Sequence, residues 1–208
     1  MYIDQPMRHF LDRLSSKSPE PGGGSAAALV GAEAAALVGM VCYLTLGKEK
    51  YADVQADIEK LKDESESVRA DLQRLLQEDT EAFAAASAAY KLPKETEEEK
   101  KVRSEKIQEG LKKATEVPFA IGAKSLDAAR LSLTAAEKGN KGAVSDAGVA
   151  VLFAESAVQA AALNVRINLT SIKDEAYVSE KWRKMQAMMN EVEVLKEKVL
   201  KITYDKIG

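Results

Sequence analysis

The 208 residues are 46% hydrophobic, enough to bury a core, but only 5% aromatic, so the core must consist mainly of alanine, valine and leucine. The net charge of −3, from 30 basic and 33 acidic residues, argues against a nucleic-acid-binding protein. The single cysteine, Cys42, excludes an intrachain disulfide, and His9, the only histidine, leaves no histidine-based metal motif or catalytic triad. We predict no metal site. The first 14 residues contain no apolar targeting segment, so we expect a cytoplasmic protein.

Helical spacing of apolar residues runs through the chain, and no segment alternates as a strand does. The first half predicts a short helix over 5–15, a second over 25–46 and a third over 51–91. The second helix is rich in alanine and glycine, and small residues at every fourth position permit close packing. It is long enough to span a membrane, but Glu33 near its middle and its weakly apolar alanines favour a buried helix.

The second half predicts three more helices. The fourth extends from the charged block at 94–101 to about Glu137, with a kink or break just before Pro118. The fifth, over 145–169, is again rich in small residues, and the sixth covers 179–204. These elements predict an all-α fold: one domain over 1–208, formed as an up-and-down antiparallel bundle of about six helices with the two small-residue-rich helices at its centre. Their apolarity on all sides also predicts a homodimer.

The segment Pro19-Glu20-Pro21-Gly22-Gly23-Gly24-Ser25 opens directly into the second helix. Glycines leave backbone amides uncovered, and a helix N-terminus attracts anions, so this loop is a candidate ligand cradle. Ser25 is expected to cap the helix. A flexible turn before an ordinary helix is the alternative interpretation.

Other candidate residues are polar side chains within apolar stretches. Asp79 precedes an alanine-rich segment, and Asp146 lies at the start of the fifth helix. A carboxyl group in apolar surroundings has a raised pKa and can act as an acid or base near neutrality. Asn164 and Asn168 share one helix face, with Arg166 roughly opposite. Helix caps, buried ion pairs or a polar stripe at a subunit interface would account for these residues equally well one by one.

Taken together, the chain resembles the cyclodeaminase/cyclohydrolase family of tetrahydrofolate enzymes. The resemblance extends from Phe10 to about Tyr204, and Glu20 and Glu49 depart from it. The matching segments are, in chain order, Pro21-Gly22-Gly23-Gly24, Gly47-Lys48-Glu49-Lys50-Tyr51, Glu78-Asp79-Thr80-Glu81-Ala82-Phe83, Ala114-Thr115-Glu116-Val117-Pro118, Gly139-Asn140, Ser145-Asp146 and Asn164-Val165-Arg166-Ile167-Asn168-Leu169. The resemblance implies an all-helical homodimer with a folate cleft near the interface and no cofactor beyond the tetrahydrofolate substrate.

Two reactions fit this resemblance. We favour methenyltetrahydrofolate cyclohydrolase, because the chain carries no formiminotransferase half, with formiminotetrahydrofolate cyclodeaminase as the close alternative. A non-catalytic helical scaffold would leave the glycine loop without a role. The predicted acid–base residues are Asp79 and Asp146, with Lys48 placed to meet an anionic part of folate or a developing charge. Arg166 has an alternative role in pairing with a carboxylate across the interface. The predicted substrate-binding residues are Pro21, Gly22, Gly23, Gly24, Ser25, Asn140, Ser145, Asn164, Arg166 and Asn168.

Overall fold

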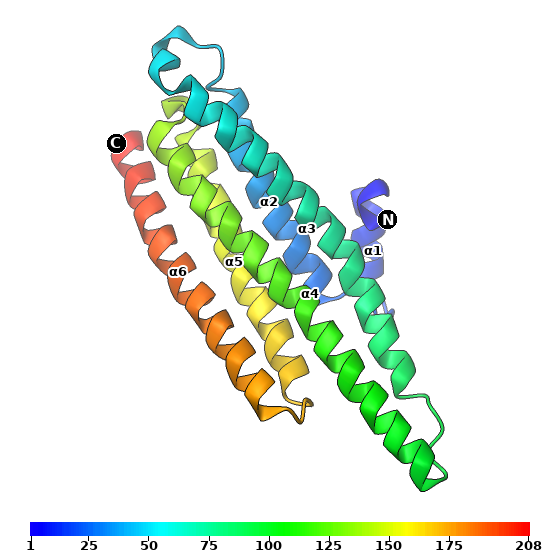
Figure 1. Ribbon diagram of the computed structural model, residues 1–208. Coiled ribbons are helices and arrows are strands. Elements are labelled where there is room, and N and C mark those ends of the chain that lie inside the picture. The colour runs from blue at the N-terminus through cyan, green and yellow to red at the C-terminus, as the bar shows by residue number, and fades with distance from the viewer.

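The computed structural model covers residues 1–208 and contains helices and turns but no strand (Figure 1). The all-α prediction is therefore confirmed. The helices are α1 (Met7–Leu14), α2 (Gly23–Tyr43), α3 (Gln55–Ala89), α4 (Glu97–Lys138), α5 (Val144–Leu169) and α6 (Glu175–Ile207), with short 3-10 turns η1 (Tyr2–Asp4), η2 (Glu49–Val54) and η3 (Lys141–Ala143). From α2 to α6 the helices run alternately up and down (Figure 1).

Two predicted helix features are wrong. α2 begins at Gly23 with Gly22 in the cap position, so Ser25 lies inside the first turn and does not cap the helix. α4 continues through Pro118 without a break, because packing against α2, α3, α5 and α6 holds a long helix together despite one missing backbone hydrogen bond.

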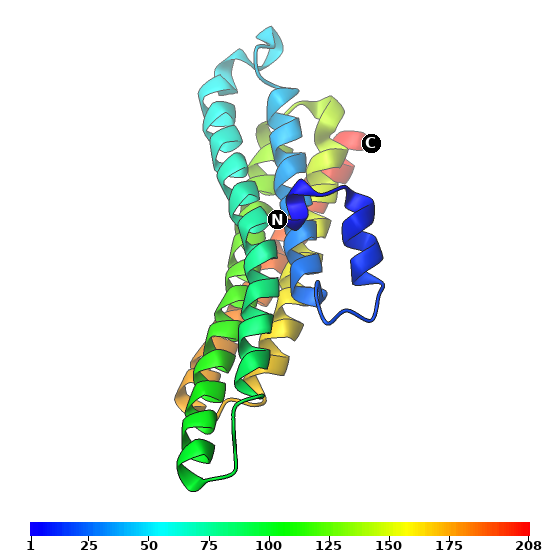
Figure 2. The same cartoon turned by 90° about the vertical axis from the view of Figure 1, so that its right-hand side faces the viewer.

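The two small-residue helices pack inside the bundle, as predicted. α2 contacts α3, α4 and α5, and α5 contacts α2, α4 and α6. Alanines such as Ala28 and Ala154 are completely buried and bring backbones close together. At Gly31, an added Cβ would lie 2.5 Å from the Ser125 hydroxyl of α4, so only glycine permits this crossing. The short α1 stands beside the bundle, with only Phe10 buried (Figure 2).

One long face of α5 is apolar but uncovered. Val149, Leu152, Phe153, Leu163 and Ile167 are all exposed, and their spacing places them on the same side of the helix. Met40 and Tyr43 of α2 are also exposed, on the side of α2 that borders α3 at Glu66. We call the five α5 residues the open face.

By length and composition, α2 and the segment Lys141–Leu169 are long and apolar enough to cross a membrane, with mean hydropathies of 1.8 and 1.5 over their most apolar stretches. Of these stretches, 61% and 50% are buried within the bundle, as in the core helices of a folded domain. Their apolarity is thus largely accounted for by packing within the chain and by the open face.

The end of α3 and the beginning of α4 extend beyond the other helices as a two-helix arm (Figure 1). No residue between Thr80 and Leu111 is buried. A capping box at Thr96 and Glu99 begins α4 at the tip of this arm. The root of the arm forms part of the wall of a cavity.

Candidate active site

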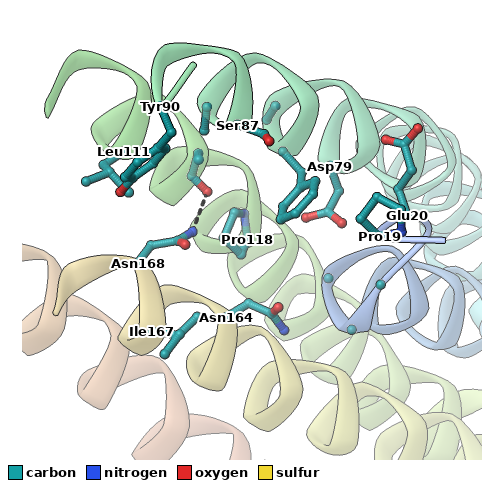
Figure 3. Close-up of a pocket in the computed structure, with 17 residues that line it drawn as sticks. Pro19, Glu20, Asp79, Ser87, Tyr90, Leu111, Pro118, Asn164, Ile167 and Asn168 are labelled. Carbon is teal, nitrogen blue, oxygen red and sulfur yellow. Dashed lines mark hydrogen bonds between the residues drawn. The ribbon is translucent and has the colours of Figure 1, made fainter. Parts of the chain in front are cut away.

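A cavity of about 530 Å³ lies where the first turn of α2 meets the later part of α3, the middle of α4 and the end of α5 (Figure 3). Its volume falls within the range of small-molecule sites. It brings together four predicted parts of the chain: the glycine loop, Asp79, Asn164 and Asn168. The lining residues are Pro19, Glu20, Gly22, Gly23, Gly24, Asp79, Ala82, Phe83, Ala86, Ser87, Tyr90, Leu111, Ala114, Pro118, Asn164, Ile167 and Asn168.

Asp79 is held against the first turn of α2. The Ser25 hydroxyl, itself fully buried, donates a hydrogen bond of 2.8 Å to Oδ2 of Asp79. An added Cβ on Gly24 would lie only 2.2 Å from Oδ1 of the same carboxyl group. Gly24 is therefore what allows the carboxyl group to touch the backbone of α2, and Ser25 fixes its direction.

The environment of Asp79 favours its protonated form. Burial raises the pKa of this carboxyl group above its usual range, while hydrogen bonds from the hydroxyl and backbone of Ser25 oppose the rise. No basic side chain forms an ion pair with Asp79, whereas neighbouring Glu78 pairs with Arg74. A half-buried carboxyl group with a raised pKa, open to a cavity, is suited to accept and return a proton.

The N-terminus of α2 adds a partly positive wall. The N-cap residue, Gly22, has no side chain to cap it, and the first-turn amides of Gly23 and Gly24 lie beside the cavity. Uncapped first-turn N–H groups and the helix dipole attract negative charge, such as a carboxylate or a developing oxyanion. Pro21 is buried and does not line the cavity, so it supports the loop without facing a ligand.

Asn164 and Asn168 lie on the α5 side of the cavity, opposite the α3 wall (Figure 3). The side-chain NH₂ of Asn164 donates to the Ala160 carbonyl at 2.9 Å, and that of Asn168 donates to the Ala114 carbonyl of α4 at 2.9 Å. Their shared face was predicted. The contact of Asn168 with α4 was not.

The apolar part of the cavity was not predicted from the sequence. Phe83 and Tyr90 of α3, together with Leu111 and Pro118 of α4, provide flat or apolar walls. Phe83 and Tyr90 are each 48% exposed although they are large and apolar. Two of the few aromatic residues of the chain, placed in an alanine-rich stretch just after Asp79, were the signal available in the sequence.

The remaining predicted residues lie at the other end of the bundle. Asp146 and Asn164 occupy the same side of α5 but are about five turns, or roughly 27 Å, apart along its axis. Ser145 is exposed beside Asp146, and Lys48 is exposed at the start of η2, beyond the far end of α2. The expectation of a single polar site therefore does not hold within one chain.

Asn140 has a structural role at this far end. Its side chain donates to the Leu44 carbonyl at 2.9 Å and accepts from the Gly142 backbone and the Tyr51 hydroxyl, while its backbone N–H donates to Thr45. These bonds fasten the α2–η2 corner to the α4–α5 corner. They leave its side chain little capacity to bind a substrate.

Arg166 also lies away from the cavity. Its guanidinium group stacks on the Trp182 ring of α6, with Cζ 4.8 Å from the ring centroid. Cys42 is fully buried in α2, and burial raises the pKa of its thiol to about 11, so it is an unreactive core residue. No group of three or more His, Cys, Asp or Glu side chains is arranged to hold a metal ion.

Comparison with known proteins identifies the family. The sequence model of the formiminotransferase-cyclodeaminase family matches residues 6–202, almost the whole chain. The chain belongs to this family. Within it, the chain is 44% identical to a methenyltetrahydrofolate cyclohydrolase of Methylorubrum extorquens, over 99% of both proteins.

Two further members are named for a cyclodeaminase activity, and one of them is a longer protein. The chain is 33% identical to the formimidoyltransferase-cyclodeaminase of Sus scrofa, covering 91% of this chain but only 35% of that longer protein. A crystal structure of formiminotetrahydrofolate cyclodeaminase from Thermotoga maritima superimposes with a TM-score of 0.90 at 30% identity, covering all of both chains. The family fold predicted from the sequence is therefore confirmed, and the family's named members are enzymes.

Proposed function

We propose that this family member is a methenyltetrahydrofolate cyclohydrolase, which hydrolyses 5,10-methenyl-tetrahydrofolate to 10-formyl-tetrahydrofolate. The observation that carries the proposal is Asp79, an unpaired carboxyl group with a raised pKa held in a folate-sized cavity beside uncapped helix amides. The full-length similarity to a protein named for this activity supports it. Because water is the only co-reactant, we expect no cofactor beyond the folate substrate. We also propose that the reaction takes place in the cytoplasm.

In the proposed mechanism, ionised Asp79 removes one proton from a water molecule as its oxygen attacks the electrophilic carbon between N5 and N10. The adduct then carries a hydroxyl group on that carbon. Asp79 returns its proton to N5 as the carbon–N5 bond breaks, and the hydroxyl proton leaves to solvent as the formyl C=O forms. In this mechanism the amides of Gly23 and Gly24, which line the cavity, stabilise the negative charge that develops on the oxygen as its last proton leaves.

Cyclodeamination is the second candidate, because the Thermotoga maritima protein of the same fold is named a formiminotetrahydrofolate cyclodeaminase. There N10 attacks an N5-formimino carbon and ammonia leaves, so the carboxyl group would protonate the leaving nitrogen instead. The same cavity can serve both reactions. The substrate assay decides between them.

The assay uses the purified chain with each substrate in turn. Loss of the absorbance of 5,10-methenyl-tetrahydrofolate above its spontaneous rate, with no ammonia from 5-formimino-tetrahydrofolate, is the expected result. Ammonia release without hydrolysis would assign the chain as a cyclodeaminase. Neither activity in a folded protein would refute an enzymatic role and favour a helical scaffold.

We also propose a homodimer through the open face. Leu163 and Ile167 are 73% and 66% exposed, an unfavourable arrangement unless a second apolar surface covers them. Ile167 also lines the cavity, so a second copy on this face would border the site. In a two-fold dimer with antiparallel α5 helices, the Asp146 and Lys48 end of each copy would approach the cavity of the other. This arrangement keeps the catalytic roles predicted for both residues.

A further inference from the structure

Pro118 creates an unusual acceptor in the middle of α4. A proline has no N–H group, so Pro118 cannot donate to the carbonyl of Ala114 one turn earlier, as any other residue would. Instead, the side chain of Asn168 reaches across from α5 and donates to this carbonyl at 2.9 Å (Figure 3). The missing backbone bond of α4 is thereby replaced by a bond between α4 and α5, directly on the cavity wall.

This bond fixes which way the Asn168 amide faces. A carbonyl oxygen can only accept, so the NH₂ of Asn168 must point at Ala114 and its Oδ1 must point away. Asn164 is oriented in the same manner by the Ala160 carbonyl. No protein group donates to either Oδ1, and both side chains line the cavity. Two acceptor oxygens about one helical turn apart are therefore available to a ligand.

These acceptors select for one edge of a reduced pterin. Its pyrimidine edge carries the 2-amino group and the neighbouring N3–H group, which are donors, whereas the one-carbon unit lies on the opposite side of the bicycle. We propose that Asn164 and Asn168 bind this donor edge through Oδ1, and that Pro118 is a positioning residue that strengthens the hold on Asn168, because it leaves the Ala114 carbonyl with no competing backbone donor. The inference rests on the proposed folate function and directs the one-carbon unit toward Asp79.

Pro118→Ala tests the positioning role. The variant regains an N–H group for Ala114, so its melting temperature should stay or rise, while its Kd for tetrahydrofolate rises about tenfold through loss of one oriented hydrogen bond. Asn168→Leu should weaken binding to a similar extent. The double variant should bind no more weakly than Asn168→Leu alone, because Pro118 acts only through Asn168. Pro93→Ala, in the exposed α3–α4 loop, is the matched control and should bind like wild type.

An analogue with methyl in place of the pterin 2-amino group tests the ligand edge. Wild type should bind it about tenfold more weakly than tetrahydrofolate, and Asn168→Leu should lose most of this preference. Unchanged Kd values and an unchanged preference in Pro118→Ala and Asn168→Leu would overturn the inference while leaving the proposed function intact. No binding of tetrahydrofolate by wild type would overturn the proposed function and the inference with it.

Discussion

Gly24→Ala is the substitution that most directly tests the geometry of the site. The backbone of Gly24 is helical and accepts alanine without strain, but the new Cβ would lie 2.2 Å from Oδ1 of Asp79. The carboxyl group must move by roughly 1.2 Å for this separation to reach 3.4 Å, the beginning of ordinary van der Waals contact. Because Asp79 ends in a flexible side chain, it can move without disturbing the fold.

The expected effects on stability and activity differ sharply. Alanine stabilises a helix by about 1 kcal/mol relative to glycine, and loss of the bond between Ser25 and Asp79 costs about the same. The free energy of unfolding should therefore change little. A displacement of about 1 Å of a catalytic group lowers turnover by about a hundredfold, so kcat should fall to about one hundredth.

Turnover of 5,10-methenyl-tetrahydrofolate and urea unfolding, measured on the same preparations, give both quantities. Gly39→Ala is the matched control, since it lies in the same helix and its new Cβ would meet nothing closer than the Ser65 hydroxyl at 3.4 Å. It should be as stable as wild type or more so, and fully active. Wild-type turnover in folded Gly24→Ala would refute the placement of Asp79 as the acid–base group.

Three further predictions concern the carboxylates and the dimer. Asp79→Asn should lower kcat by about a hundredfold or more, yet it should unfold at a higher urea concentration than wild type at pH 7. The raised pKa of Asp79 means that the ionised carboxyl group destabilises the fold at pH 7, and the gain should vanish below about pH 3, where the wild-type carboxyl group is protonated in both the folded and the unfolded chain. Unchanged turnover, or a gain independent of pH, would contradict this account. Light scattering should give about twice the 22.5 kDa mass of one chain. The double variant Leu163→Glu, Ile167→Glu should be a monomer, because it places two charges on the open face. The control, Val194→Glu at an exposed position of α6, should remain a dimer. If equal amounts of Asp79→Asn and Asp146→Asn chains are unfolded, mixed and refolded, about half of the dimers contain one chain of each kind. Each mixed dimer has one intact site of two if a site combines residues of both copies, so about a quarter of wild-type activity should return. No recovery would show that Asp146 does not complete the site of another copy.

The helices were predictable because the signals are local. Apolar spacing, small-residue stripes and glycine turns located all six, with boundaries displaced by a few residues. Ser25 was wrongly expected to cap α2 because the pattern does not distinguish a capping serine from one that faces another helix. The break expected at Pro118 was wrong for a related reason: contacts with α5, distant in the sequence, maintain α4 at that point.

The division of the site could have been derived from the topology. In an up-and-down bundle, the start of α2, the later part of α3 and the end of α5 lie at one end, which brings Gly24, Asp79 and Asn164 together. The corner after α2 and the corner before α5 lie at the other end, which places Lys48 and Asp146 at the same end of the bundle. These residues were predicted to form one site because all of them belong to the segments that resemble the family. The directions of the helices instead place them in two groups, at opposite ends of a single chain.

Stability considerations point to the same cavity. Gly24 occupies a helix position where alanine would be more stable, Pro118 interrupts the hydrogen bonds of a 42-residue helix, and Asp79 keeps a carboxyl group half buried without an ion pair. A groove of about 620 Å³ on α3 and α4 is larger than this cavity. It is lined by alanines and by lysines that pair with Glu109, and these residues cost the fold no stability. Departures from local stability concentrate where a protein performs chemistry. The smaller cavity contains all three departures, which makes it the stronger candidate for the active site.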